Sequence, residues 1–361
     1  MINITDSCIH ILKNFNFQNK NYKIPQNILY SFNITYKKEY NYEKIVACNL
    51  KQKKIFEKII NDNKFMSNRI KKNIIPDVIH CEIIKYDNIT INFFFSDNKN
   101  TNINYNIFIH ICLFYKSLTK DNRNILIYIY FGDSKKIYPK DNFFTEHHVN
   151  SGLSYKSEDE TYIFIWRKEE VIKVLFHELI HYFQIDYSDE IYKIEYIIKK
   201  NFNIKGKDAP RESFTEILAT IFNCVFCSLY FKIDVGILIN YEIQFSNFQI
   251  TKILNNMSSD YNEILQTSLN KKYICQKTNV VSYFFIKNIV MNNVDVFLQL
   301  IENNLYINNI INEYCKLIYY KIKDNSKYLK SPEHNKLCSS DNSIIKNTLR
   351  MSCVEFNIFN K

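Results

Sequence analysis

Residues 177–181 read His177-Glu178-Leu179-Ile180-His181, directly after the apolar run VIKVLF at 171–176. The run predicts a helix that sinks into a core. Residues four apart share one face of a helix, so both imidazoles can reach a single Zn²⁺, while Glu178 projects beside them as a candidate general base. The stretch therefore predicts a zinc site of the HExxH pattern on a buried helix.

The composition is that of a folded chain. It has 361 residues, 46% hydrophobic and 16% aromatic, and can bury one large core or two moderate ones. The formal net charge of +10 is spread along the sequence, which favours solvated surfaces over a nucleic-acid footprint. With only 4 glycines and 5 prolines, the residue bias is typical of an AT-rich genome rather than of a particular fold.

The cysteines and apolar runs point to an intracellular, cytoplasmic protein without a membrane partner. The 10 cysteines are dispersed and no secretory segment follows Met1, so we expect reduced thiols. Cys224 and Cys227 have apolar residues between them and no second pair, which favours buried thiols over a metal or redox site. The apolar stretch 217–231 is shorter than the roughly 18 to 20 residues that span a bilayer, and predicts a buried helix. The cysteines are Cys8, Cys48, Cys81, Cys112, Cys224, Cys227, Cys275, Cys315, Cys338 and Cys353.

The stretch before the HExxH pattern predicts a sheet. Segments 78–84 and 89–95 are rich in β-branched and aromatic residues around a polar turn, as in a hairpin, and 125–131 is typical of a buried strand. Segment 107–118, between them, has helical spacing. Segments 148–153 and 161–166 predict two more strands, of which the first is polar enough to lie at a sheet edge.

The remainder is expected to be mainly helical. Region 1–75 carries short amphipathic stretches such as 42–61, and no chemical signal. We expect three consecutive regions: 1–75, mainly helical; 76–190, with the sheet and the HExxH helix; and 191–361, helical and carrying a third metal ligand. The expected C-terminal helices are 190–200, 210–230, 241–256, 279–290, 294–302 and 307–320.

This order of elements resembles the zincin architecture. In that α+β fold a small, twisted, mixed sheet backs the metal helix, and a polar edge strand along the cleft binds an extended peptide through backbone hydrogen bonds. The resemblance implies that Asn150, Ser151 and Gly152 bind substrate. A helix with two inward histidines also needs, on physical grounds, a rigid sheet behind it and an open side before the metal.

Two imidazoles leave a catalytic zinc site incomplete, because such a site usually takes three protein ligands. Downstream, Glu212 and Glu216 share one face of the expected helix 210–230, and carboxylates on an otherwise apolar helix need a reason to be there. Glu212 is the preferred third ligand. The alternatives are Glu216, Asp186, His147 and His148.

The stretch around these acids resembles the second motif of the gluzincin metallopeptidases. The resemblance implies Glu212 as the third zinc ligand and Glu216 as an outer acceptor for the ring N–H of a ligand histidine. Asp186 is either a second outer residue or a surface turn residue. Glu212 follows His181 by 212 − 181 = 31 positions, more than in thermolysin-like members, which puts the subfamily in doubt. No Gly-x-x-His follows His181, which argues against the metzincins.

A narrower resemblance covers about residues 125–235. The segments 148–152 and 167–170, the HExxH pattern and 212–219 together look like a group of metallopeptidases encoded by large cytoplasmic DNA viruses. This resemblance implies a viral protein in the host cytoplasm or in a virion. It supplies no substrate.

A metallopeptidase also needs a donor for the oxyanion that forms when hydroxide attacks the carbonyl. Among 27 tyrosines, Tyr283 is the first candidate, and Arg350 is the second.

The sequence thus predicts a zinc metallopeptidase, a hydrolase acting on a peptide or protein substrate, with zinc on His177, His181 and Glu212 and with Glu178 as the base. Two alternatives are a non-catalytic binding or structural protein with a zincin fold, and a DNA-associated protease. The intact Glu178 disfavours the first, and the dispersed charge disfavours nucleic acid. The sequence does not specify the oligomeric state.

Overall fold

The protein is described from a computed structural model that covers residues 20–46, 50–78, 80–96, 102–158, 160–330, 332–338 and 347–359. Cys8, Cys48 and the first nineteen residues of the expected region 1–75 lie outside this part of the chain. The fold is mixed α+β, as expected. It divides into two units, each assembled from separate stretches, and the three consecutive regions expected from the sequence stay a prediction.

One unit, here called the sheet unit, comprises Gln26–Lys135, Asn150–Phe183 and Phe356–Lys361. Its six-stranded mixed sheet has the order β1-β2-β3-β4-β7-β6. The central strands β3, β4 and β7 run parallel, while β1, β2 and β6 pair antiparallel with their neighbours. The strands are β1 (Glu43–Val46), β2 (His80–Tyr86), β3 (Ile89–Phe95), β4 (Ile125–Tyr130), β6 (Gly152–Lys156) and β7 (Thr161–Ile165).

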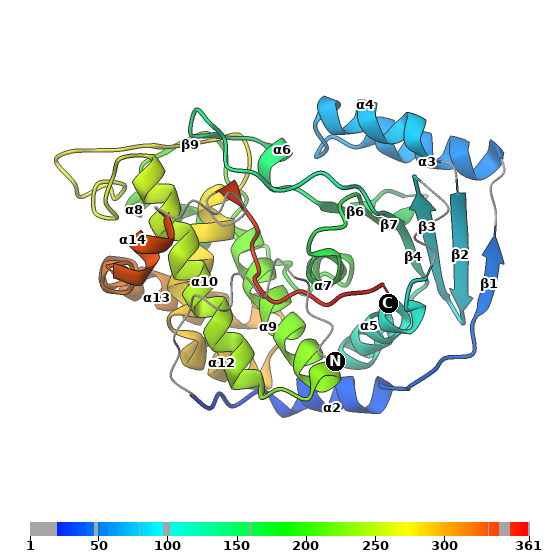
Figure 1. Cartoon of the computed structure of the whole chain (residues 1–361). Helices are drawn as coiled ribbons and strands as arrows, with labels where there is room; N and C mark the ends of the chain where they lie inside the picture. The colour runs from blue at the N-terminus through cyan, green and yellow to red at the C-terminus, as the bar shows by residue number, and fades with distance from the viewer. Residues whose placement is uncertain are drawn as a thin grey trace. The chain divides into compact units, whose positions relative to one another are not determined.

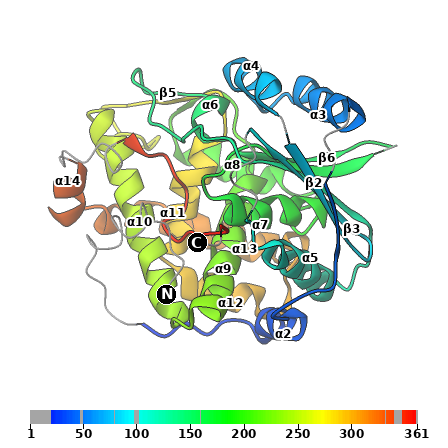
Figure 2. The ribbon, with the colours of Figure 1, turned by 45° about the vertical axis from the view of Figure 1, so that its right-hand side comes forward.

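Apolar side chains on the two faces of this sheet explain its layers. On one face, Phe94, Tyr130 and Phe164 form a core with side chains of α3 (Leu50–Asp62) and α4 (Asn68–Asp77). These two helices lie side by side in Figures 1 and 2. On the other face Phe93 packs edge-on against Phe108 of α5 (Tyr105–Thr119), with ring centroids 5.0 Å apart. The central strands β3, β4 and β7 are therefore buried on both faces, which suits their continuous apolar sequences.

The helix α7 (Val171–Tyr182), which carries the HExxH pattern, is held beside α5 in this second layer. Tyr115 of α5 donates a hydrogen bond to the carbonyl of Phe176 at 2.6 Å. α2 (Gln26–Thr35) covers α5 through Phe32, which stacks on Phe114 with centroids 3.7 Å apart. The expected helix with a sheet behind it is confirmed within this unit.

Three local predictions need correction. The hairpin turn shrinks to Asp87 and Asn88, because Asp87 adopts φ 48° and closes a two-residue turn. Residues 43–46, which had seemed part of an amphipathic stretch, form β1, since pairing with β2 outweighs their local pattern. The expected strand 148–153 begins only at Gly152, because Glu146–Val149 forms the single turn α6.

The other unit, here called the helical unit, comprises Met1–Pro25, Lys136–Val149 and Gln184–Glu355. Its centre is α9 (Arg211–Phe231), which packs against α10 (Val235–Asn256), the π-helix η1 (Val281–Ile286) and α11 (Lys287–Met291) (Figure 2). The remaining helices are α8 (Tyr192–Asn201), α12 (Val294–Asn303), α13 (Ile307–Lys321), the 3₁₀ turn η2 (Lys323–Tyr328) and α14 (Pro332–Cys338). A small parallel sheet joins β5 (Phe143–Phe144), β9 (Ile274–Gln276) and β8 (Ile204–Lys205).

Two of the expected helices of this unit differ clearly from the structure, whereas the ends of the others agree within two residues. α10 begins at Val235 rather than Tyr241, since Asp234 caps it by accepting hydrogen bonds from the backbone of Gly236 and Ile237. The expected helix 279–290 is divided into η1 and α11. A π-helical turn has no simple periodic signal in the sequence, and such turns are often found at functional sites.

α9 is the one helix of the described chain that is long and apolar enough by itself to cross a membrane. Of its most apolar window, 78% is buried inside the protein, as in the core helix of a globular domain. The prediction of a buried helix at 217–231 is confirmed.

Candidate metal centre

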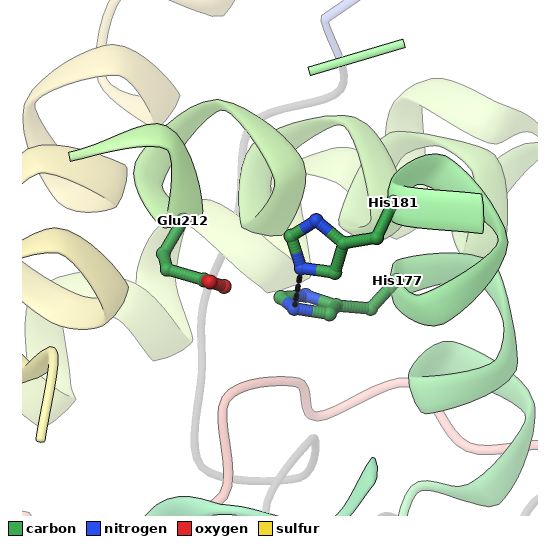
Figure 3. A group of neighbouring side chains, drawn as sticks. All are labelled: His177, His181 and Glu212. Carbon is green, nitrogen blue, oxygen red and sulfur yellow. Dashed lines mark hydrogen bonds between the residues drawn. The ribbon is translucent and has the colours of Figure 1, made fainter. Parts of the chain in front are cut away.

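α7 brings its two histidines together as the spacing predicts. The Nε2 atoms of His177 and His181 lie 3.1 Å apart (Figure 3). Two neutral imidazole nitrogens at this distance can share one hydrogen, and a cation bound to both is an alternative arrangement. All of α7 except His181 is buried, so packing fixes the helix and leaves this ring partly accessible.

Glu178 lies directly against the first residue of the edge strand β6. A Cβ built on Gly152 would be 2.5 Å from Oε1 of Glu178 and 2.8 Å from its Cγ. These distances are shorter than real Cβ contacts, so the side chain of Glu178 occupies the space that a side chain at position 152 would need. Glu178 is 4% exposed.

The start of β6 is anchored by Arg167, which follows β7. Its Nε donates to the carbonyl of Asn150 at 2.9 Å, and its Nη1 donates to the carbonyl of Ser134 at 3.3 Å. Burial lowers the pKa of the Arg167 guanidinium to about 10, while the charges of Glu169 and Glu170 oppose that shift. The guanidinium therefore keeps its charge at neutral pH, and it links the residue before Ser151 at the start of β6 to Ser134, which follows β4.

The expected substrate residues lie at this strand end. Asn150 donates from Nδ2 to the carbonyl of Phe65 at 3.2 Å, and the carbonyl of Ser151 accepts the backbone N–H of Trp166 at 3.0 Å. Gly152 opens β6, which ends the sheet order. The expectation of an edge strand here is confirmed, whereas substrate binding by these residues stays a prediction.

In the helical unit, Glu212 and Tyr283 are neighbours. The Tyr283 hydroxyl, on η1, donates to Oε2 of Glu212, in the first turn of α9, at 3.2 Å. The Nε of Arg211 lies 4.0 Å from the other carboxylate oxygen of Glu212. The expected third ligand and the expected oxyanion donor, 71 residues apart, thus meet at one carboxylate.

Asp208 fixes η1 against the start of α9. Its carboxylate accepts hydrogen bonds from the hydroxyl and backbone N–H of Ser282 and from Nε2 of Gln276, the last at 3.0 Å. Burial raises the pKa of Asp208, and these hydrogen bonds oppose the shift. The neighbouring Tyr283 is thereby held in its place on the π-helical turn.

Glu216 has a different setting one turn further along α9. Its Oε1 lies 3.3 Å from Nζ of Lys287 on α11, and both side chains are buried. Lys287 also donates to the carbonyl of Met351. No sequence pattern points to this lysine, because a partner 71 positions away follows from packing alone.

The ligand atoms of His177, His181 and Glu212 lie within 4.8 Å of one another (Figure 3). This group could hold a metal ion. Its members are the three residues that the sequence predicts as ligands.

Three other candidate residues, Asp186, His148 and Arg350, have hydrogen-bond or ion-pair partners. Asp186 is buried and accepts a hydrogen bond from the hydroxyl of Thr215 at 3.1 Å. His148 accepts the backbone N–H of Thr145 at 3.1 Å through Nδ1, closing a local turn. Arg350 forms a buried ion pair with Glu355 at 2.9 Å.

The prediction that Cys224 and Cys227 are buried thiols is confirmed. Burial raises the pKa of Cys224 well above its usual value. The described cysteines form no disulfide with one another.

Comparison with known proteins identifies no family and no activity for this chain. No family model and no solved structure matches the chain. The chain is similar to an uncharacterized protein of Acanthamoeba polyphaga mimivirus, with 25% identity over 204 residues that cover 48% of this chain and 50% of that protein. It thus spans about half the length of this relative. The relative is viral and its name states no activity, so the gluzincin resemblance stays a prediction.

Proposed function

We propose that this protein is a zinc-dependent metallopeptidase of the gluzincin type. The observation that supports the proposal most strongly is the convergence of His177, His181 and Glu212, whose ligand atoms lie within 4.8 Å of one another. Two imidazole nitrogens and one carboxylate oxygen form a donor set that suits catalytic zinc, which keeps a further position open. Bound zinc would supply Lewis-acid activation of a water molecule and of the substrate carbonyl.

The chain's own residues have separate tasks in this proposal. Glu178, whose carboxylate belongs to α7 as both histidines do, takes the proton of the attacking water and passes it to the leaving amine nitrogen. Among the described strands β6 pairs with β7 alone, so its outer edge suits an extended peptide held by backbone hydrogen bonds. In the reaction the Tyr283 hydroxyl turns its one hydrogen from Glu212 to the oxyanion.

The decisive experiment compares the wild-type protein with Glu178→Gln. We expect the purified wild type to bind one zinc per chain and to hydrolyse members of a peptide library. Glu178→Gln should retain the zinc and lose at least about 100-fold in kcat, because a positioned base contributes about 10²–10⁴ to the rate. Undiminished hydrolysis by the variant would exclude Glu178 as the base.

The same preparation separates the alternatives. A protein that binds zinc but hydrolyses no peptide would be a binding or structural protein. DNA binding that weakens steeply with salt would favour the DNA-associated protease, since neutralisation of phosphates releases counterions.

A further inference from the structure

The proposed base lies against a residue that has no side chain. Gly152 opens β6, and the position of its missing Cβ is 2.5 Å from Oε1, 2.8 Å from Cγ and 2.9 Å from Cδ of Glu178. Three atoms of one side chain thus lie closer to that position than a real Cβ would allow. Gly152 and Glu178 belong to the same unit.

The backbone does not explain the glycine. Gly206 is the described glycine with a positive φ, at 124°, whereas Gly152 lies in ordinary strand conformation that any residue adopts. Glycine weakens a strand interior because it contributes no packing and loses more backbone entropy on folding. Its presence at 152 is explained by the space that Glu178 needs.

We propose that Gly152 is a positioning residue for Glu178: the bare backbone at the start of the edge strand is the surface against which the carboxylate rests. Arg167 supports this arrangement, because its hydrogen bond to the carbonyl of Asn150 at 2.9 Å fixes the strand end. The strand proposed to hold the peptide thereby also sets the distance between that peptide and its base. This inference rests on the proposed function.

The effect of a methyl group at this position can be anticipated. The obstructing atoms belong to a flexible side chain rather than to backbone, so the fold can accommodate Gly152→Ala by turning Glu178 aside. A displacement of about 1 Å in a catalytic group can cost about 100-fold in rate. The variant should therefore fold and bind zinc while its base is misplaced.

The kinetic test compares wild type, Gly152→Ala and the control Thr90→Ala on β3 of the same sheet. We expect kcat of Gly152→Ala to fall by about 10- to 100-fold, with zinc content unchanged and KM within about threefold. Thr90→Ala should keep both constants. An active wild type with an unchanged kcat in Gly152→Ala would overturn the positioning role and leave the peptidase proposal intact.

A second measurement does not depend on activity. Melting temperatures of the metal-free wild type, Gly152→Ala, Glu178→Ala and the double variant form a double-mutant cycle. We expect Gly152→Ala to lower the melting temperature beside Glu178 and to leave it unchanged or raised in the Glu178→Ala background, where the methyl group has space and restricts the unfolded chain. Equal shifts in both backgrounds would overturn the contact. If the cycle shows coupling but the wild type hydrolyses nothing, the proposed function fails, and the positioning role fails with it.

Discussion

α7 and α9 each carry a pair of ionisable residues four positions apart on a mostly buried helix, and the two pairs have different surroundings. On α7 the Nε2 atoms of His177 and His181 approach to 3.1 Å. On α9, Glu212 accepts a hydrogen bond from Tyr283, whereas Glu216 forms a buried pair with Lys287. The same spacing brings His177 and His181 together, whereas Glu212 and Glu216 contact different partners. Helical periodicity sets the face, and the elements packed against that face set the role.

The largest expected effect concerns the acid with the buried partner. Glu216→Ala leaves Lys287 as a buried charge without this carboxylate, and we expect the free energy of unfolding to fall by about 3–5 kcal/mol in denaturant titration. The combined change Glu216→Leu and Lys287→Met should recover most of the loss, since an apolar pair of similar volume needs no compensation.

The matched control for that experiment is Glu195→Ala. Glu195 forms an ion pair at 2.5 Å with Lys199, four positions later on the surface of α8. Its loss should cost no more than about 0.5 kcal/mol. Similar losses for Glu216→Ala and Glu195→Ala would contradict the structural role of the buried pair.

The next effect is on metal binding. Glu212→Ala should weaken zinc binding by more than about 100-fold in calorimetric titration. Loss of an outer residue that supports a ligand lowers metal affinity by about 10- to 100-fold, and we expect loss of a ligand itself to lower it further. Its metal-free stability should change far less than that of Glu216→Ala. A larger loss of zinc affinity in folded Glu216→Ala than in Glu212→Ala would show that Glu216, rather than Glu212, is the ligand.

The smallest effect is expected at Tyr283. Tyr283→Phe removes the hydroxyl that donates to Glu212, and zinc affinity should fall by about tenfold, as for an outer residue that orients a ligand. A fall in kcat at saturating zinc would support the proposed donation to the oxyanion. An unchanged kcat would limit the tyrosine to orienting Glu212.

Local patterns were sufficient for much of the sheet unit. Alternation and continuous apolar runs predicted the hairpin, β4, β7 and the edge position of β6, because these strands carry their burial in their own residues. β1 was missed, since four mostly exposed residues become a strand only through pairing with β2. The π-helical turn η1 was missed because the same apolar residues also fit an α-helix.

The sequence by itself determined the types of the candidate ligand residues, the spacing of the two histidines on α7 and that of the two acids on α9. These features are local, since a helix repeats every 3.6 residues wherever it lies. Only the tertiary structure decided that Lys287 neutralises Glu216, that Tyr283 meets Glu212 and that Gly152 makes room for Glu178. Each of these contacts joins residues at least 26 positions apart, and such contacts follow from packing, for which a single sequence carries no periodic signal.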